Sequence, residues 1–394
     1  MKRLDLTLYC VANGFAHRSM SGGAKIFIET VRAHINNGIK VVIITNKIGI
    51  FLFNQENIGD VEFILTDEKE EDLLNPISIF FWYIKRGIKS CQIISQIKRR
   101  PGNKIWLFES DFYCNTITTP FLKNEKLIVI FAMVAPSPFY GYINKLHFPS
   151  IQEFHYYVSN LFTFLIIRIF KKISNVIFIA ITPNVLEDLK RNKIISKFNT
   201  EIIYPGIDDF TSQNYEKIYD FVWIGRNHPQ KGIDDLEKII LYIKKEMHDF
   251  KILIIGELED RMNNFAKTHN CAQNIVAVGK KYNKEKFALL SQAKVFLFTS
   301  HFESLGIVVI ENMLVENLIV GFDIASSRVN YEGKMEFVKQ FDTYEFADKA
   351  IDLLKHYDEK KMLIDSNKEF ALTFNWNNIF LKYQKIYTEF YEFQ

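Results

Sequence analysis

Short apolar runs alternate along the chain with stretches in which apolar residues recur every three or four positions. The first run, residues 5–12, has the length of a strand, and a loop rich in Gly, Asn and Ser follows it. A second apolar run covers residues 39–45. Between the two runs, apolar spacing predicts a helix through Ile26, Phe27, Thr30, Val31 and His34. The order predicts two parallel strands joined by a helix, because continuous apolar strands suit parallel sheets covered on both faces.

The same alternation continues toward the middle of the chain. Apolar runs predict strands at residues 61–65, 105–108, 127–131, 176–182 and 201–204. Helical stripes between these runs predict helices at residues 76–100, 154–173 and 183–190. Residues 206–219 are polar and lack periodicity, so they are the best candidate for a linker.

Beyond this linker the alternation begins again. Strands are predicted at residues 221–224, 251–255, 275–278, 295–299 and 318–322. Helices are predicted at residues 233–247, 260–269, 284–291, 307–316, 344–357 and 376–393. The chain therefore repeats one architecture and predicts two doubly wound α/β halves. Ligands of such folds bind at the carboxyl ends of the strands, which we expect here to face a cleft between the domains.

Length and composition agree with a multidomain globular protein. The 394 residues allow two or three domains, and the 48% hydrophobic and 24% charged residues exclude wholesale disorder, collagen and a small disulfide scaffold. The 36 Phe and 18 Tyr are many, which we attribute mainly to compositional drift.

Cysteine usage and apolar run length bear on the compartment. Cys10, Cys91, Cys114 and Cys271 have no metal or redox spacing, which favours a reducing compartment. The start of the chain lacks the features of a signal peptide. The most apolar stretch, residues 161–170, is too short to span a bilayer. We expect a cytoplasmic protein, with peripheral association at the cytoplasmic membrane face left open.

The strongest candidate chemistry lies at residues 299–313. A strand ends there, a short loop holds Glu303 and Gly306, and a helix carrying Glu311 follows. A helix N-terminus offers free N–H groups to an anion, and a carboxylate one or two turns later can accept two vicinal hydroxyls, as in a ribose. The alternative is a capping acid plus a solvated glutamate.

Two further loops could contact phosphate groups. Arg226 and Lys231, in the loop after the strand at residues 221–224, could grip a diphosphate, although two ordinary surface cations would give the same pattern. Gly22 and Gly23 follow the first strand and would let backbone amides approach a phosphate, unless the turn is merely flexible. This turn matches neither a dinucleotide fingerprint nor a P-loop.

Taken together, these residues resemble a known family. The spacing from Glu303 to Glu311 is similar to the E-x7-E motif of the retaining family-4 glycosyltransferases, also called glycosyl transferases group 1. Weaker resemblances to motifs of that family follow in the expected order at residues 21–23, 203–208, 224–232, 254–256 and 374–376. The resemblance covers nearly the whole chain.

The resemblance implies an α/β GT-B fold in which two Rossmann-like domains face a cleft. Residues 1–206 would form the N-terminal acceptor domain, residues 207–373 the C-terminal donor domain, and residues 374–394 a return helix that crosses back to the N-terminal domain. The implied activity is metal-independent, retaining transfer of a hexose-type sugar from a UDP- or GDP-type nucleotide sugar to a glycan, lipid-linked or protein acceptor. No other cofactor is implied, and the chain has no Asp-x-Asp metal motif.

The resemblance also implies roles for individual residues. Arg226 and Lys231 would hold the donor diphosphate, and Glu311 would bind the ribose hydroxyls. Gly22 and Gly23 would pack against the phosphates from the other domain. The donor sugar and its phosphate would meet Glu303 and the amides of Ser304, Leu305 and Gly306.

One departure from the family pattern leaves alternatives open. The family often carries a His after the strand at residues 127–131, and here the nearest candidates are His147 and Asp111. His147 could equally be an ordinary loop residue. A catalytically degenerate GT-B module that binds glycan or serves as a partner subunit, and a GT-B sugar epimerase, therefore remain alternatives to the transferase.

The small net charge of +3 hides an uneven distribution. Residues 77–206 hold 17 Lys and Arg against 7 Asp and Glu, whereas residues 207–394 hold 24 against 29. The helices at residues 77–100 and 154–173 combine aromatic, apolar and basic residues, a composition that suits an anionic membrane surface. Two ordinary core-packing helices with solvated cations are the alternative. No motif supports nucleic-acid binding.

Overall fold

The computed structural model describes residues 6–15, 22–59, 61–67, 76–110, 113–134, 151–170, 175–191, 200–211 and 215–392. The described chain divides into two compact units. Unit 1 holds the described residues up to 206 together with those from 376 onward. Unit 2 holds the described residues from 207 to 375.

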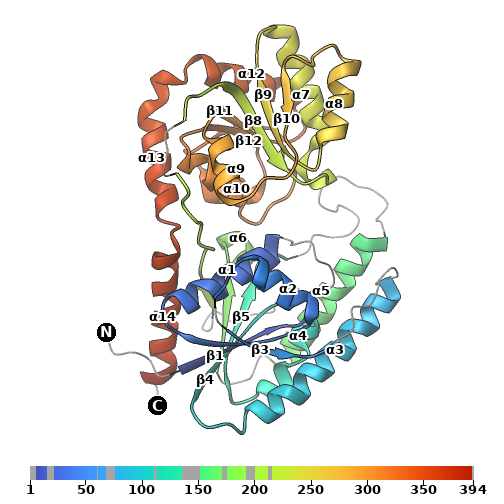
Figure 1. The fold of residues 1–394 in the computed structure, drawn as a ribbon, viewed down its shortest axis with the longest axis vertical. Coiled ribbons are helices and arrows are strands. Elements are labelled where there is room, and N and C mark those ends of the chain that lie inside the picture. The colour runs from blue at the N-terminus through green and yellow to red at the C-terminus, as the bar shows by residue number, and fades with distance from the viewer. Residues whose placement is uncertain are drawn as a thin grey trace. The chain divides into compact units, whose positions relative to one another are not determined.

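Unit 1 is built on a parallel sheet. Its described residues form seven strands in the order β3-β2-β1-β4-β5-β6-β7, so the strand order reverses between β1 and β4 (Figure 1). Residues of β1 pair with both neighbours, as Leu8 does with Val41 and Ile105. The strands are β1 (Leu6–Ala12), β2 (Lys40–Thr45), β3 (Glu62–Leu65), β4 (Asn103–Glu109), β5 (Lys126–Phe131), β6 (Val176–Ala180) and β7 (Thr200–Ile202).

Helices cover both faces of this sheet. Crossovers between parallel strands are right-handed, so α1 and α2 lie on one face and α3, α4 and α5 on the other. The helices of unit 1 are α1 (Gly22–Asn36), α2 (Lys47–Gln55), α3 (Pro76–Ile97), α4 (Tyr113–Thr116), the 3-10 turn η1 (Thr119–Leu122), α5 (Ile151–Phe170), α6 (Pro183–Arg191) and α14 (Trp376–Glu392).

Unit 2 repeats the doubly wound plan. Its described residues form six parallel strands in the order β10-β9-β8-β11-β12-β13, with the reversal between β8 and β11. The strands are β8 (Tyr219–Gly225), β9 (Ile252–Gly256), β10 (Ile275–Ala277), β11 (Ala293–Phe298), β12 (Leu318–Phe322) and β13 (Glu336–Val338).

The helices of unit 2 include several that the apolar pattern predicts. They are η3 (Pro229–Lys231), α7 (Ile233–Glu246), α8 (Glu259–Thr268), α9 (Asn283–Leu290), α10 (Ile307–Leu314), α11 (Ala325–Tyr331), α12 (Thr343–Lys355), η4 (Asp358–Lys360) and α13 (Lys361–Leu372). The prediction of two doubly wound α/β structures is confirmed.

The sequence pattern missed some short elements and one longer helix. Helix α2 directly follows β2, and its N-cap Asn46 accepts from the Gly49 amide at 2.8 Å, so a capping residue rather than a long stripe defines it. Helix α13 buries few side chains, which leaves only a faint apolar stripe. The three-residue strand β13 adds an edge to the sheet of unit 2.

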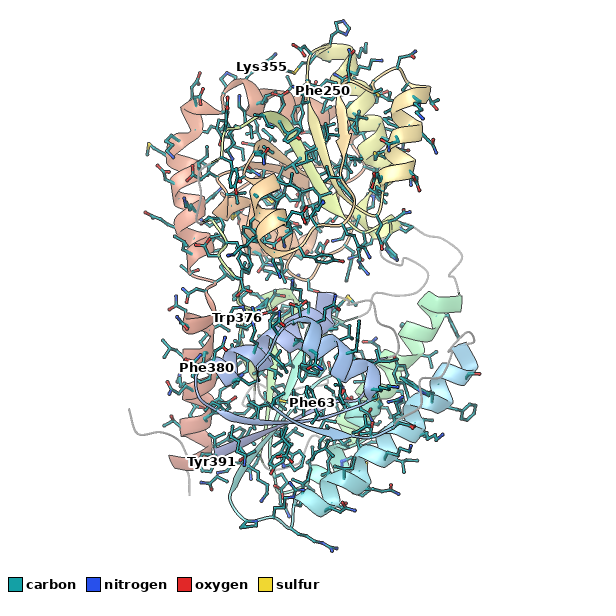
Figure 2. All side chains as sticks on the ribbon, in the orientation of Figure 1. Phe63, Phe250, Lys355, Trp376, Phe380 and Tyr391 are labelled. Carbon is teal, nitrogen blue, oxygen red and sulfur yellow. The ribbon has the colours of Figure 1, made fainter. Side chains whose placement is uncertain are left out.

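Each sheet is buried between its helices. Trp106 and Phe108 on β4 are fully buried in unit 1, and Phe221 on β8 packs against Phe250 in unit 2 with ring centroids 6.3 Å apart. Figure 2 labels Phe250 within unit 2. Burying one such side chain stabilises the fold by roughly 1.5–3 kcal/mol. The continuous apolar runs of the central strands therefore follow from burial on both faces.

The last helix, α14, belongs to unit 1, as the expected return helix should. It packs against α1, where the His34 ring meets Phe380 at a centroid distance of 5.3 Å. Figure 2 labels Phe380 on α14. At the start of α14 the Trp376 ring lies so close to Gly206 that a Cβ there would come within 2.3 Å of it. Glycine is therefore needed where the chain leaves the sheet of unit 1.

A buried hydrogen bond also joins α1 to α14. The His34 Nδ1 lies 2.6 Å from the Thr30 carbonyl, which can only accept, so Nδ1 donates. The Tyr387 hydroxyl then donates to Nε2. Burial lowers the pKa of His34 from its usual value of about 6.5 to about 4, although the bond to Thr30 opposes this shift.

We expect this neutral histidine to make the protein less stable in mild acid. Between pH 6.5 and 4 the unfolded chain binds a proton at His34 that the folded chain does not, so stability falls as pH drops through that window. The shift corresponds to about 3 kcal/mol at its limit. At pH 7 the melting temperature of His34→Leu should lie below that of wild type, but it should fall less steeply toward pH 4.5. The exposed control His269→Gln should show the same pH dependence of melting temperature as wild type. An unchanged slope in His34→Leu would contradict the assignment.

Candidate functional site

The candidate site lies where the strand order of unit 2 reverses. Strands β8 and β11 are neighbours there, and crossovers leave them in opposite directions. Such a reversal opens a crevice at the carboxyl ends of the two strands, which is where ligands of doubly wound sheets bind. The loops at residues 226–232 and 299–306 follow those two ends. The topology therefore brings together two segments separated by about 70 residues in the sequence.

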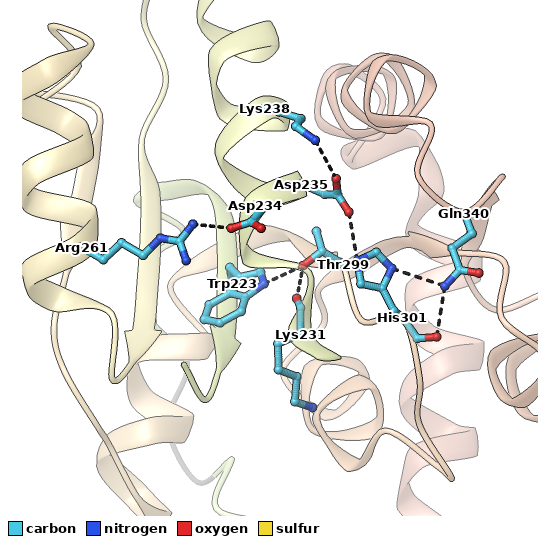
Figure 3. A network of polar contacts seen from close by, with 9 residues as sticks. All are labelled: Trp223, Lys231, Asp234, Asp235, Lys238, Arg261, Thr299, His301 and Gln340. Atoms are coloured by element: carbon cyan, nitrogen blue, oxygen red, sulfur yellow. Dashed lines mark hydrogen bonds and ion pairs between the residues drawn. The ribbon is translucent and has the colours of Figure 1, made fainter. Parts of the chain in front are cut away.

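Three hydrogen bonds and an ion pair fasten these two loops to each other, and a fourth hydrogen bond ties the second loop to β8. The Thr299 hydroxyl donates to the Lys231 carbonyl at 2.7 Å (Figure 3). The His301 amide donates to the Gln230 carbonyl at 2.8 Å, and the Gln230 side chain donates to the Phe302 carbonyl at 2.7 Å. The indole N–H of Trp223 donates to the same Thr299 hydroxyl at 2.9 Å. Fixed loops of this kind preorganise a polar site.

His301 connects the second loop to α7. Its Nε2 lies 2.9 Å from an Asp235 carboxylate oxygen, and the Gln340 amide lies 3.3 Å from Nδ1 and donates to the His301 carbonyl at 3.1 Å (Figure 3). Burial raises the pKa of Asp235, but hydrogen bonds from His301 and Lys238 outweigh it and hold that pKa below its usual value. The carboxylate is therefore charged at neutral pH and fixes the imidazole.

Gly232 permits the close approach of the two loops. Its φ of 65° is left-handed, and a Cβ at this position would lie 2.0 Å from the Thr299 carbonyl oxygen. Any other residue would meet both backbone strain and a clash. Helix α7 begins directly after it, with Asp234 held at 2.6 Å by Arg261 (Figure 3).

Two candidate side chains of these loops, Lys231 and Glu303, meet as an ion pair. The Lys231 ammonium bonds a carboxylate oxygen of Glu303, and their side chains are only 14% and 12% exposed. Arg226 is exposed and has no ion-pair partner among the residues that the structure describes. One cation is thus neutralised and partly desolvated, and a second is available to an anion from solution.

The start of α10 adds backbone donors. Gly306 takes the left-handed conformation with φ 74°, and the helix begins at Ile307. Within the described chain, the amides of Leu305, Gly306 and Ile307 have no acceptor. The Tyr331 hydroxyl donates to the Leu305 carbonyl at 2.7 Å, which fixes the turn before α10. A helix start with free amides and no acidic residue in its first turn attracts anions.

Glu311 lies in the second turn of α10 and meets a cation that the motif analysis did not include. Lys286 on α9 donates to Glu311 Oε1 at 2.5 Å, with the two side chains 13% and 9% exposed. The other carboxylate oxygen, Oε2, is buried without a hydrogen-bond partner among the described residues. A buried acceptor of this kind is costly unless a ligand completes it.

Replacing Lys286 should weaken this half of the site. Removing one partner of a buried ion pair costs about 3–5 kcal/mol, because the remaining charge loses its compensation. We expect Lys286→Met to lower the melting temperature and to weaken nucleoside diphosphate binding by about tenfold or more. Isothermal titration checks this, with the exposed neighbour Lys284→Met as a control that stays within about twofold. Equal binding by both variants would contradict a role for Lys286.

The structure brings together the predicted residues of unit 2. Lys231, Glu303, Ser304, Leu305 and Gly306 lie on the two adjoining loops, and Arg226 begins the first of them. Glu311 follows on α10. Gly22 and Gly23 belong to unit 1, where they form the first turn of α1. Ser21, Asp111 and His147 lie outside the described residues.

Sequence reasoning missed Lys286, Asp235 and the role of His301. Lys286 comes from a helix about 25 residues before Glu311, and no local spacing links the two. His301 stands within the motif at residues 299–313, so its proximity to Glu303 was a usable signal. Asp235 looks like an ordinary acidic residue at a helix start until the fold places it against His301.

The reversal point of unit 1 has a different character. Asn13 directly follows β1 and is fully buried. Its Nδ2 donates to the Arg86 carbonyl at 3.1 Å and to Ser90 at 3.0 Å, and its Oδ1 accepts from Thr66 at 2.7 Å and from the Arg86 guanidinium at 3.2 Å. The Asn13 side chain thus uses both its nitrogen and its oxygen, so the network stiffens the end of the sheet.

The arrangement in unit 2 suits an anionic ligand that also carries a diol. Free amides, Lys231 and Arg226 offer positive charge at one end, and the unfilled oxygen of Glu311 offers an acceptor on the same helix. Charge-assisted hydrogen bonds of these two kinds are among the stronger polar contacts in proteins.

Comparisons with known proteins agree with this chemistry. Residues 207–370 match the family described as Glycosyl transferases group 1. An uncharacterized glycosyltransferase of Methanocaldococcus jannaschii is 25% identical over 211 residues, which are 52% of this chain and 56% of that protein. The chain therefore spans about half the length of this curated relative.

Two solved structures share the fold along nearly the whole chain. Sucrose-phosphate synthase from Thermosynechococcus elongatus aligns with a TM-score of 0.74 at 15% identity, covering 98% of this chain and 100% of that one. HepE from Anabaena, in complex with UDP and glucose, aligns with a TM-score of 0.71 at 12% identity, covering 97% and 99%. The family match lies within unit 2, and over nearly its whole length the chain shares the fold of these two structures, the GT-B fold.

Proposed function

We propose that the protein is a retaining, metal-independent glycosyltransferase. It takes a hexose-type sugar from a nucleotide diphosphate donor and passes it to a glycan, lipid-linked or protein acceptor. The donor binds unit 2, and the acceptor binds unit 1, whose residues up to 206 carry the excess of basic side chains.

The observation that carries the proposal is the partly buried ion pair of Lys231 with Glu303, whose loop leads into the free amides that begin α10. A nucleoside diphosphate leaves with growing negative charge on its phosphates. Cations and amides that already point at that position stabilise the charge without reorganising. Arg226, exposed on the same loop, adds a second cation.

Glu311 and Glu303 divide the remaining polar recognition between them. The unfilled oxygen of Glu311 accepts ribose hydroxyls, since a carboxylate can take both members of a vicinal diol. Glu303, held by Lys231, contacts the donor sugar beside its phosphate. Retention rests on the E-x7-E spacing, in which the chain resembles the retaining enzymes of the family. Contact of Gly22 and Gly23 with the phosphates remains part of the proposal.

The comparisons support a UDP-type donor as the first to test. HepE was solved with UDP and glucose, and its chain aligns over nearly all of this one. The family match covers residues 207–370, the part of the chain that holds Arg226, Lys231, Glu303 and Glu311.

Product stereochemistry tests the proposal. The protein is incubated with UDP-glucose, UDP-N-acetylglucosamine and GDP-mannose, with and without EDTA and with water as the acceptor, and NMR reads the configuration of the sugar as first released, before it mutarotates. The proposal expects the α configuration of these donors in the product and the same rate in EDTA. An inverted product, or a rate abolished by EDTA and restored by a divalent cation, would contradict it.

A catalytically degenerate module that binds glycan is the second candidate. Ala132, Met133 and Val134 follow β5, so no histidine occupies the described positions after that strand. Such a module would bind nucleoside diphosphate or glycan but release no product from any donor. Release of product by the wild-type protein would exclude it.

A further inference from the structure

Two helices of unit 1 expose large apolar side chains to solvent. On α3 these are Phe81 and Ile88, which are 65% and 52% exposed. Along α5 they are Phe154, Leu161, Leu165 and Ile169, all between 49% and 61% exposed. The 3-10 turn η1, which contacts both helices, exposes Phe121. We call this set, with Lys85 and Arg168, the α3/α5 face.

The apolar residues lie along single stripes. Phe81 and Ile88 are seven residues apart, which is two helical turns, with Lys85 between them on the same side. Leu161, Leu165 and Ile169 follow one another at four-residue intervals on α5, and the exposed Arg168 adjoins them. Each helix therefore has a second apolar stripe, in addition to the one that packs on the sheet.

The two stripes belong to one layer of unit 1. Both helices lie on the same face of the sheet, by the right-handed crossover rule, and they run alongside each other (Figure 1). Phe80 of α3 meets Phe162 of α5 with ring centroids 6.1 Å apart. The exposed stripes therefore lie on two helices that pack against each other.

The structure separates the core residues of these helices from their surface residues. Trp82 and Tyr83 are buried in a cluster with Cys114, and Arg86 is buried with its guanidinium 4.0 Å from the centre of the Trp82 ring. These residues are core and do not belong to the surface. Lys171 and Lys172, which end the predicted helix, lie outside the described residues.

The charges on this face favour a negative partner. Helix α3 contains no acidic residue, and α5 contains only Glu153 at its first turn. Arg99, two residues beyond the end of α3, and Arg168 have no ion-pair partner within the part of the chain that the structure describes. A symmetric contact between two copies would place these cations against their own equivalents, which disfavours a dimer through this face.

We propose that the α3/α5 face docks unit 1 on an anionic membrane surface. Apolar side chains along two parallel helices enter the boundary between headgroups and acyl chains, while the cations meet anionic headgroups. The contact is peripheral. Within the described residues, no helix combines the length and apolarity that crossing a bilayer requires.

Liposome flotation tests the docking, and it is independent of sugar transfer. The full-length protein is mixed with phosphatidylcholine vesicles, with or without phosphatidylglycerol, and its bound fraction is measured. Wild type should float with the anionic vesicles and far less with the neutral ones. Phe81→Ser/Leu165→Ser should lower partitioning by about tenfold or more, and Lys85→Gln/Arg168→Gln by about fivefold for each cation removed.

Matched controls distinguish vesicle binding by the α3/α5 face from non-specific binding by other exposed apolar residues. Val329 and Met362 of unit 2 are 55% and 87% exposed, and Val329→Ser/Met362→Ser should float as wild type does. Circular dichroism and nucleoside diphosphate binding establish that each variant is folded. Unchanged flotation of Phe81→Ser/Leu165→Ser would overturn the proposal. So would equal binding to neutral vesicles, or light scattering that finds a dimer which this double substitution dissociates.

Discussion

Replacing Lys231 with alanine is expected to reduce donor turnover by about 10²–10³-fold in kcat. The Lys231 side chain is only 14% exposed and is paired with Glu303, in the loop that leads into α10, where the leaving diphosphate would gain charge. A cation in such a partly desolvated position acts more strongly than one in water. Steady-state release of nucleoside diphosphate from the preferred donor measures the loss.

The matched control is Lys251→Ala. Lys251 is exposed and lies at the amino end of β9, the opposite end of the same sheet. It should stay within about twofold of wild type. A comparable loss in both variants, or full turnover by Lys231→Ala, would contradict the assigned role.

Lys231 and Glu303 should also be coupled. Either single substitution leaves a charge without its partner. The free-energy change of the double variant Lys231→Ala/Glu303→Gln should therefore be smaller than the sum of the changes in the two single variants. Contacting residues of this kind show coupling energies of about 0.5–3 kcal/mol. A double-mutant cycle on melting temperature and on kcat/KM measures that coupling. Strict additivity would mean that the two groups act independently.

Replacing Glu311 with alanine is expected to have the second large effect, a loss of affinity for nucleoside diphosphate. A hydrogen bond to a charged group contributes about 1.5–3 kcal/mol, so loss of the carboxylate should weaken nucleoside diphosphate binding by about 10–100-fold. Isothermal titration with UDP measures it, with GDP in parallel. The exposed Glu285→Ala on α9 should bind as wild type does.

A ligand lacking the hydroxyls tests the contact itself. Wild type should bind 2′,3′-dideoxy-UDP more weakly than UDP, whereas Glu311→Ala should bind the two almost equally. The reason is that the variant has already lost the acceptor that distinguishes them. If Glu311→Ala discriminated as strongly as wild type, the ribose assignment would be wrong.

Much of the fold follows from the sequence, because burial on both faces makes the central strands continuous apolar runs. The runs at residues 39–45 and 105–108 fall on β2 and β4. The polar segment at residues 206–219 lies between β7, the last strand of the first sheet along the chain, and β8, the first strand of the second sheet. Helix α2 was missed because a cap at Asn46 defines it, and α13 because its apolar stripe is faint. A helix that is defined by its cap or that buries few side chains has little apolar periodicity in its sequence.

The candidate site divides in a similar way. Lys231, Glu303 and Glu311 could be proposed from motif spacing and family resemblance, since each stands within a local pattern. Lys286 and Asp235 could not, because contact with Glu311 and His301 is made by folding and leaves no trace in spacing. By its aromatic and basic composition, the helix at residues 77–100 suits a membrane surface, but its Trp82 and Tyr83 are buried in the core.

The central claim is that unit 2 carries a nucleotide-sugar donor site from which the protein transfers sugar. The most direct measurement is release of nucleoside diphosphate from a panel of UDP- and GDP-sugars, comparing wild type with Lys231→Ala. We predict that wild type turns over at least one donor and that the variant loses about a hundredfold or more of that rate. Tight binding of nucleoside diphosphate by wild type without turnover of any donor would contradict the claim.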